Sequence, residues 1–204
     1  MRAFVRDTAI AAPLAGINID TDQIIPARFM KRNRADGYGQ YLFHDHRFEP
    51  DGSPRPDFVL NWPEFSGARI LVVGRNFGCG SSRESAVYAL VDYGINAVLA
   101  PSFGDIFHSN ALKNGLIPVA LSEDVVNELR NALIAGAKRE VCVDLEAQTV
   151  TLPDDSSHRF PIDPFWRECI LKGVDEIDLT RGHLEQIEAF ERQYEHDRPW
   201  VVLP

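Results

Sequence analysis

The chain has 204 residues, of which 45% are hydrophobic and 25% charged, a composition ordinary for a soluble globular protein with a substantial core. Its formal net charge of −9 argues against a nucleic-acid partner, because phosphate binding requires a positive surface. A small anionic substrate stays possible, since such a substrate responds to a local cluster of cations and not to the total charge.

The cysteines and the N-terminus bear on metal content and location. Cys79, Cys142 and Cys169 are widely spaced and form no CxxC pair, so we expect neither a zinc site nor a complete cysteine-ligated iron–sulfur cluster within this chain. Residues 1–16 contain Asp7 and no long apolar core, unlike a signal peptide. No apolar run reaches the length of about 18 residues that a membrane helix needs. We therefore expect a reduced, cytoplasmic protein without a membrane partner.

Residues 17–60 are irregular and rich in turn formers and charge. Long irregular segments in compact domains are usually functional or mobile. From residue 68 onward, buried strands alternate with helices, which predicts a parallel sheet with helical crossovers. The predicted strands are 68–73, 97–100 and 116–121, and the predicted helices are 82–93, 104–113 and 123–135, the last with Ser122 as its N-cap.

The last third of the chain predicts a hairpin and two helices. Residues 141–145 and 149–152 form the expected hairpin. Helices are expected at 164–171 and at about 180–195. The tail RPWVVLP, residues 198–204, has no regular period and fits either a loose end or a segment that lies against a partner.

The segment 74–85, GRNFGCGSSRES, joins a predicted strand to a predicted helix. Gly78 and Gly80 permit close backbone approach by a ligand. Ser81, Ser82 and Arg83 then bring two hydroxyls and a guanidinium to a helix start, which is suited to a carboxylate or a phosphate. The same residues also fit a purely structural capping box, in which Ser81 and the glutamate three residues later cap the helix reciprocally.

Known motifs with similar composition do not fit segment 74–85. The glycine spacing matches neither a P-loop nor a dinucleotide fingerprint, and an esterase elbow is absent. Cys79 lies near a helix start, but no base is placed beside it, so we expect a packing role in the turn rather than a nucleophile.

A second candidate region follows residues 18–23, NIDTDQ, which on their own are typical of a turn. Arg28, Lys31, Arg32 and Arg34 fall within seven positions of an otherwise acidic chain. They are either solvated or form a local basic loop suited to a di- or tricarboxylate. The run His44-Asp45-His46 lacks a third ligand at metal-site spacing, so we do not expect a metal there.

Together, NIDTDQIIPARFMK (18–31), GRNFGCGSSRES (74–85) and DYGINAVLAPSFGDIFHSNALKNGLIPV (92–119) resemble the small-subunit family of the 3-isopropylmalate dehydratases. That subunit corresponds to the swivelling domain of the aconitase superfamily. The resemblance covers nearly the whole chain and implies an α/β fold with a mostly parallel sheet layered with helices. It implies one swivelling domain over 1–204, with 17–60 as the substrate-loop region and 160–204 as a C-terminal helical extension.

The resemblance also implies a division of labour. The large partner subunit would carry a [4Fe–4S] cluster, this chain would hold no cofactor, and the two would form a hydro-lyase that interconverts 2-isopropylmalate and 3-isopropylmalate in leucine biosynthesis. Ser81 would be the catalytic base, as an alkoxide. Ser82 and Arg83 would bind a substrate carboxylate, and either Lys31 or Arg28 would supply a further cation.

One position departs from the family pattern. The family commonly reads GSSREHA, and here Ser85 replaces the histidine. This keeps open a related dehydratase acting on citramalate, homoaconitate or a methylated malate, or a non-catalytic carboxylate-binding module. Met30 favours an isopropyl group over a third carboxylate, which would prefer arginine. We also expect the loop 28–43 to be mobile in the isolated subunit, because its basic residues repel one another.

Overall fold

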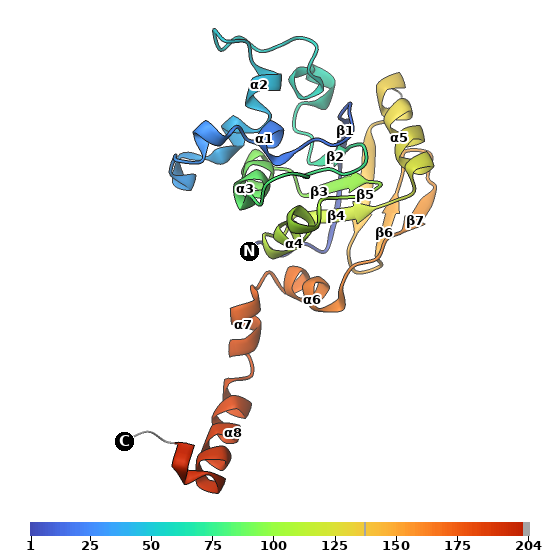
Figure 1. The fold of residues 1–204 in the computed structure, drawn as a ribbon. Helices are drawn as coiled ribbons and strands as arrows, with labels where there is room; N and C mark the ends of the chain where they lie inside the picture. The colour runs from blue at the N-terminus through green and yellow to red at the C-terminus, as the bar shows by residue number, and fades with distance from the viewer. Residues whose placement is uncertain (137, 202–204) are drawn as a thin grey trace.

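The computed structural model describes residues 1–136 and 138–201. Seven strands form one mixed sheet in the order β4-β3-β2-β1-β5-β6-β7 (Figure 1). The first four run parallel to one another, and β5, β6 and β7 continue the sheet by antiparallel pairing. The strands are β1 (Arg6–Pro13), β2 (Ile70–Val72), β3 (Ala97–Ala100), β4 (Ile117–Ala120), β5 (Glu140–Asp144), β6 (Thr149–Thr151) and β7 (Ser157–Arg159).

The described residues form eight α-helices and several single 3₁₀ turns, most of which connect or cover the strands. Helices α3 and α4 are the crossovers that join β2 to β3 and β3 to β4, as parallel strands require, whereas α5 leads from β4 to the antiparallel strand β5. The helices are α1 (Thr21–Ile24), α2 (His44–Arg47), α3 (Glu84–Tyr93), α4 (Asp105–Lys113), α5 (Glu123–Ala135), α6 (Pro164–Lys172), α7 (Glu176–Arg181) and α8 (Leu184–Asp197). None of these helices has the length and apolarity needed to cross a membrane.

The central strands are buried on both faces, and their side chains divide between two apolar clusters. Leu71 and Val98 contribute to one cluster, whereas Ile70, Val72 and Leu99 contribute to the other. This alternation follows from the two-residue period of a strand. Continuous apolar runs are typical of parallel strands covered on both sides, which is why 68–73 and 97–100 could be predicted.

Different parts of the chain cover the two faces. Residues 19–65 and α3 supply the side chains over one face. Helices α5 and α6, together with the inward curl of β5–β7, enclose the other. The substrate-loop region expected at 17–60 is thus a covering layer of short helices and turns and contains no strand of the sheet.

The structure confirms the predicted parallel strands, the hairpin of β5 and β6, and the helices α4, α5 and α6. Strands β1 and β7 were not predicted. β1 has the sequence RDTAIAAP, whose alanines have low intrinsic strand preference, and it is held as a strand by neighbours on both sides. The helix expected at about 180–195 is two helices, α7 and α8, which Gly182 and His183 separate.

In the C-terminal segment, α6 packs against the sheet, whereas α7 and α8 extend into solvent. Helix α6 buries Cys169 and packs Ile170 into the cluster that contains Ile70 and Val72. Helices α7 and α8 bury no side chain and project away from the sheet (Figure 1). Of the predicted tail, Pro199–Val201 forms a 3₁₀ turn, and residues 202–204 lie outside the described residues.

Candidate active site

Three loops meet beyond the carboxyl ends of β1, β2 and β3, the edge of a parallel sheet where ligands usually bind. The Gly78 N–H donates to the carbonyl of Ile19 at 2.7 Å, which joins the loop after β2 to the loop after β1. Bridges between Asp20 and Cys79 and between Phe77 and Phe103 add further backbone pairing. The segment 74–85 is therefore held on both sides by its neighbours.

Two glycines allow this loop to pack closely against α4. A Cβ at Gly78, where φ is +72°, would lie 2.2 Å from the Phe107 ring. A Cβ at Gly104 would lie 2.7 Å from the Gly78 carbonyl oxygen. An aromatic ring of the protein occupies the space of the missing Gly78 side chain, whereas the Gly78 backbone lines the cavity of Ser81, so close approach of a ligand to that backbone stays a prediction. Gly80, at φ +92°, has its nearest neighbour at 3.4 Å and stays open to a ligand.

Helix α1 fixes the backbone of the candidate base. Asp20 caps this helix and forms a capping box with Gln23, with hydrogen bonds of 2.8 and 3.0 Å. The next residue, Thr21, is buried, and its hydroxyl donates to the Ser81 carbonyl at 2.9 Å. Its N–H donates to the Cys79 carbonyl at 3.0 Å. The TDQ sequence thus supports the glycine-rich loop as well as forming a turn.

Helix α3 begins later than predicted. Its first residue is Glu84, Arg83 is the N-cap in an extended conformation, and no side chain caps the helix. The predicted capping box of Ser81 and Glu84 is wrong, because Ser81 precedes the N-cap by two residues. Glu84 instead accepts a 2.9 Å hydrogen bond from Asn114. Ser81 and Ser82 are exposed, and within the described residues their hydroxyls have no hydrogen-bond partner.

Arg83 lies beside Ser81 and is held from one side. Its guanidinium pairs with Asp22, whose carboxylate also accepts from the Ala27 N–H at 3.0 Å. The Arg83 side chain is only 20% exposed, whereas that of Asp22 is 59% exposed. The hydrogen bond from Arg83 is the main reason that the pKa of Asp22 is lowered.

Thr21, Ser81 and Arg83 line one cavity of about 240 Å³. Its walls also include residues 78–80 and the first turn of α4, 104–107. The N-terminus of α4 therefore faces the cavity, and Arg83, the N-cap of α3, brings the start of the helix after Ser81 to the same cavity. A hydroxyl, a guanidinium and a helix N-terminus around one cavity are suited to binding a carboxylate.

The structure separates the basic residues that the sequence grouped. Arg28 pairs with both oxygens of Asp45, one at 2.8 Å, and its guanidinium lies 4.5 Å from the Phe29 ring centre. Its hydrogen bonds lower the pKa of Asp45 to about 2. Arg28 and Asp45 line a different cavity from Ser81. Asp45 of the His44-Asp45-His46 run is thus an arginine partner, and the described residues contain no group of three potential metal ligands.

Arg34 is held on α3. It lies 3.1 Å from Asp92 and 3.8 Å above the ring centre of Tyr88. Gly39 packs against the same helix so closely that a Cβ there would lie 2.6 Å from the Asp92 carbonyl. Two of the four loop cations therefore have acidic partners, which reduces the repulsion on which the expectation of a mobile loop was based. Lys31 is exposed and forms no ion pair within the described part of the chain.

Met30 and Ser85, the residues expected to bear on substrate choice, lie near the ends of this region. Met30 is 39% exposed and follows Phe29, whose ring stacks on Tyr41 with centres 4.3 Å apart. Ser85 is half-buried in the first turn of α3. Neither residue lines the cavity of Ser81.

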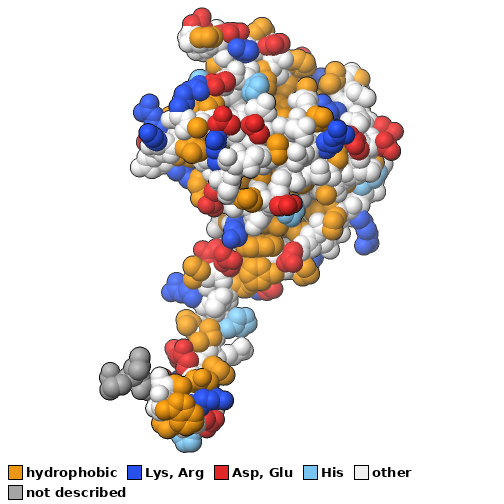
Figure 2. Space-filling view, viewed as in Figure 1, with side chains coloured by type: hydrophobic (Ala, Val, Ile, Leu, Met, Phe, Trp, Pro, Cys, Tyr) orange, Lys and Arg blue, Asp and Glu red, His pale blue; other side chains and the backbone are white. Residues whose placement is uncertain are grey.

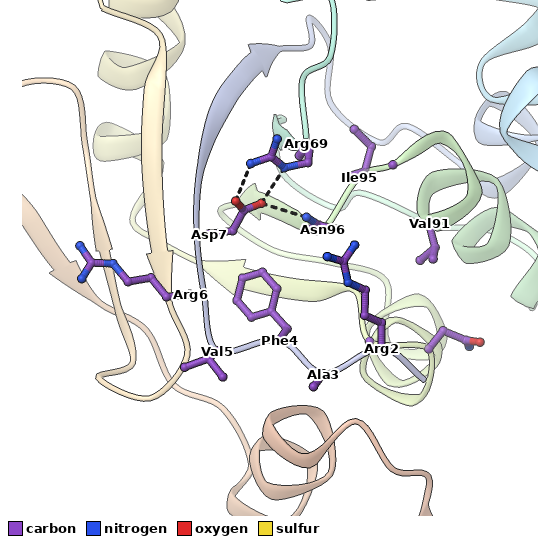
Figure 3. Close-up of a pocket in the computed structure, with 13 residues that line it drawn as sticks. Arg2, Ala3, Phe4, Val5, Arg6, Asp7, Arg69, Val91, Ile95 and Asn96 are labelled. Carbon is purple, nitrogen blue, oxygen red and sulfur yellow. Dashed lines mark hydrogen bonds and ion pairs between the residues drawn. The ribbon is translucent and has the colours of Figure 1, made fainter.

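A larger cavity, of about 490 Å³, lies at the opposite edge of the sheet (Figure 3). Asp7 accepts hydrogen bonds there from Arg69 at 2.6 and 2.9 Å and from Asn96 at 2.9 Å. These bonds join the starts of β1, β2 and β3 and leave the carboxylate fully engaged. This network supports the fold, and the smaller cavity at Ser81 is the better candidate for chemistry.

Comparison with known proteins shows the family to which the chain belongs. The aconitase C-terminal domain family matches residues 1–124, and a second family, LeuD_N, matches residues 127–164. The 3-isopropylmalate dehydratase small subunits of Rhodospirillum centenum and Dinoroseobacter shibae are 50% and 48% identical, over 99% and 98% of this chain and all of theirs. Both alignments therefore include α7 and α8, which lie beyond the residues that the two families match.

A solved structure supports the same relationship. The crystal structure of 3-isopropylmalate dehydratase from Methanocaldococcus jannaschii superposes with a TM-score of 0.63 at 28% identity. The match covers 90% of this chain and 99% of the archaeal chain. On these findings, the chain belongs to the family of 3-isopropylmalate dehydratase small subunits, built on the aconitase C-terminal domain.

Proposed function

We propose that this chain is the small subunit of a 3-isopropylmalate dehydratase, a hydro-lyase of leucine biosynthesis, and that it acts together with a large subunit. The observation that carries the proposal is the placement of Ser81 and Arg83 in one cavity at the carboxyl edge of the sheet. The relatives described above carry the same activity in their names. The substrate is a dicarboxylate, which the cations of this edge are suited to bind.

The described residues of this chain offer no ligand set for an iron–sulfur cluster, so we assign the cluster of the reaction to the large subunit. Cys79, Cys142 and Cys169 are all free, and no three potential metal ligands cluster among the described residues. A [4Fe–4S] cluster held by the large subunit would supply a Lewis acid for the hydroxyl that leaves the substrate. This chain would close the active site from the opposite side.

Ser81 is the proposed base. As an alkoxide it takes a proton from the carbon next to the one that bears the hydroxyl group, and loss of that hydroxyl leaves an unsaturated dicarboxylate. Addition of water at the neighbouring carbon, with the proton returned by Ser81, completes the interconversion of 2-isopropylmalate and 3-isopropylmalate. An ordinary serine is a very weak acid, so the alkoxide needs positive surroundings. Arg83 and the α4 N-terminus contribute to these, whereas Asp105 in the same lining opposes them.

Arg83 and Ser82 are the proposed carboxylate ligands. Because Asp22 holds one nitrogen of the Arg83 guanidinium, the remaining N–H groups stay available in a fixed orientation. Ser82 is exposed beside it and can donate its hydroxyl to the same carboxylate. Cys79 has no catalytic or ligand-binding role in this proposal.

Of the two further cations, we favour Lys31 over Arg28. Arg28 is engaged by Asp45, whereas Lys31 is exposed without an ion pair among the described residues. Stacking of Phe29 on Tyr41 anchors the loop and leaves Met30 and Lys31 free to meet substrate. Met30 would contact the isopropyl group, and Lys31 the second carboxylate.

Reconstitution with the large subunit under anaerobic conditions tests the proposal. A Ser81→Ala variant is expected to assemble normally and to lose turnover by about 10³-fold or more, as expected for loss of a catalytic base that acts on a poorly acidic proton. Arg83→Gln is expected to raise KM and to lower kcat. Full turnover by assembled Ser81→Ala would refute the base assignment. Faster turnover of citramalate or homoaconitate than of isopropylmalate would refute the substrate assignment.

A further inference from the structure

The segment 174–201, which we name the C-terminal arm, has no buried side chain. It contains α7, α8 and the closing 3₁₀ turn, and it extends from the end of α6 into solvent (Figure 1). An ion pair of 3.9 Å between Lys113 on α4 and Glu176 connects its start to the body. Both partners of that pair are largely exposed, so it contributes little to holding the arm.

The arm exposes several large apolar side chains. The exposed fraction is 66% for Ile177, 65% for Phe190 and 75% for Trp200. Figure 2 shows hydrophobic side chains gathered at the far end of the arm. Single exposed apolar residues are ordinary on a protein surface, but a contiguous group of them marks an interaction site.

Helix α8 presents its apolar residues as one stripe. Leu184, Ile187, Phe190 and Tyr194 fall within roughly 120° of the helix circumference, at 100° per residue. The rings of Phe190 and Tyr194 are 5.7 Å apart, so the stripe is continuous at its centre. A helix of 14 residues without a packing surface is marginal in water, and a partner that covers the stripe would stabilise it.

The charge of the arm identifies the kind of surface that covers it. Residues 174–201 contain eight acidic and three basic side chains. At about 100° per residue, Glu188, Glu191 and Glu195 lie along the Leu184 edge of the apolar stripe. Packing two copies of α8 against each other would bring these glutamates together, which is unfavourable. The arm therefore fits a different polypeptide, with an apolar groove and a basic rim.

We propose that the C-terminal arm docks on the large subunit, with the stripe of α8 and Trp200 seated in an apolar groove edged by lysine and arginine. This inference rests on the proposed function, because that function requires a large subunit. The arm lies beyond residue 164, where the family matches end, and the Rhodospirillum centenum small subunit aligns along it. The arm would thus add a second contact between the subunits, separate from the Ser81 cavity.

Two neighbouring substitutions on α8 test the proposal. Phe190→Asp places a charge in the stripe, and Ala189→Asp places the same charge about 100° away on the polar side, where Ala189 is also exposed. The control is demanding, because replacing alanine costs more helix propensity than replacing phenylalanine. Dissociation constants are measured by titration calorimetry of each full-length chain with the purified large subunit.

We expect Phe190→Asp to weaken binding at least about tenfold, as loss of an aromatic anchor does, and Ala189→Asp to stay within about twofold of wild type. With excess large subunit, Phe190→Asp should recover the wild-type kcat.

Equal affinity of Phe190→Asp and wild type in an active complex would overturn the arm proposal alone. Absence of binding and turnover by the wild-type pair would overturn the proposed function itself. A wild-type dimer that Phe190→Asp converts to a monomer, with unchanged affinity for the large subunit, would assign the stripe to self-association and overturn the proposal.

Discussion

The hydroxyl of Thr21 donates to the carbonyl oxygen of Ser81 at 2.9 Å, across 60 positions of the chain. Thr21 is the one buried polar side chain among the described residues. The bond joins the loop that carries the candidate base to the capped start of α1. It holds the backbone of Ser81 while the side chain of Ser81 stays exposed to the cavity.

Replacing Thr21 by valine should therefore affect catalysis more than stability. Valine keeps the shape of threonine and removes the donor, so unfolding free energy should fall by about 1 kcal/mol. The loosened Ser81 backbone should lower kcat about tenfold, because a small misplacement of a catalytic group is costly. Urea denaturation and kinetics of the reconstituted enzyme measure both effects.

Thr21→Ser is the matched control, since it retains the hydroxyl. It should keep most of the wild-type kcat. If Thr21→Val and Thr21→Ser turn over equally fast, the hydrogen bond to the Ser81 carbonyl has no part in positioning the base.

The Asp7 network should be a measurable source of stability. The Asp7 side chain is 17% exposed and accepts from Arg69 and Asn96, which belong to the starts of two other strands. Asp7→Ala should lower the unfolding free energy by about 2 kcal/mol, because it leaves both donors without their partner. The exposed pair of Lys138 and Asp155 provides the control, and Lys138→Ala should cost under about 0.5 kcal/mol.

The same network predicts a pH dependence. The Arg69 hydrogen bond is the main cause that lowers the pKa of Asp7 below its ordinary value of 3.8. A lowered carboxyl pKa stabilises the fold at pH values above 3.8, and this contribution is lost as the pH falls through the folded-state value. The stability difference between wild type and Asp7→Ala should therefore be full at pH 6 and shrink below about pH 4. A difference that stays constant from pH 6 to pH 3 would contradict the ionic role of Asp7.

The sequence allowed prediction of the features that depend on local pattern. Helices α4 and α5 have helical spacing and clear ends, and Ser122 caps α5 as expected. β2 and β3 follow from short apolar runs. Strand β1 could not be predicted, because its alanines gain their strand conformation from the strands on either side.

The sequence could indicate which residues the candidate site contains, but not how their backbones and partners are arranged. Ser81 and Arg83 do line one cavity, but the extended backbone at Arg83 delays the helix and removes the predicted capping box. The separation of Arg28 from Ser81 depends on Asp45, and the support of Ser81 depends on Thr21. Such pairings are set by the packing of distant loops, which local sequence does not encode.

The pair of Arg28 and Asp45 gives a direct titration test. The pKa of Asp45 is about 2, chiefly because Arg28 donates to its carboxylate. Arg28→Ala should return this pKa toward 3.8, the ordinary value, as measured by carboxyl chemical shifts in NMR. The pair is about half exposed, so the change in overall stability should stay under about 1 kcal/mol.

The titration also bears on which cation meets the substrate. If Arg28 is committed to Asp45, Arg28→Ala should change KM less than Lys31→Ala does in the reconstituted enzyme. A larger KM effect for Arg28→Ala, together with an unshifted Asp45 pKa, would reverse the preference for Lys31.

Gly78 should be the least replaceable glycine of the site loop. An alanine there would need φ of +72° and would place its Cβ 2.2 Å from the Phe107 ring, in a contact that real Cβ atoms do not make. Phe107 is buried against Phe77, with ring centres 5.2 Å apart, so it cannot move aside without repacking the core. Gly78→Ala should cost about 3 kcal/mol or more, combining backbone strain with overpacking.

Gly37→Ala separates the two causes, because Gly37 has φ of +84° and no neighbour within 4 Å of the added Cβ. It should cost only the backbone strain, about 1–2 kcal/mol. A larger loss for Gly78→Ala than for Gly37→Ala in urea denaturation then indicates the Phe107 contact. A second variant, Phe107→Leu on the Gly78→Ala background, should recover part of the lost stability if the ring is the obstacle. Equal losses for Gly78→Ala and Gly37→Ala would show that α4 yields to the added methyl group and that the loop is held less tightly than its packing indicates.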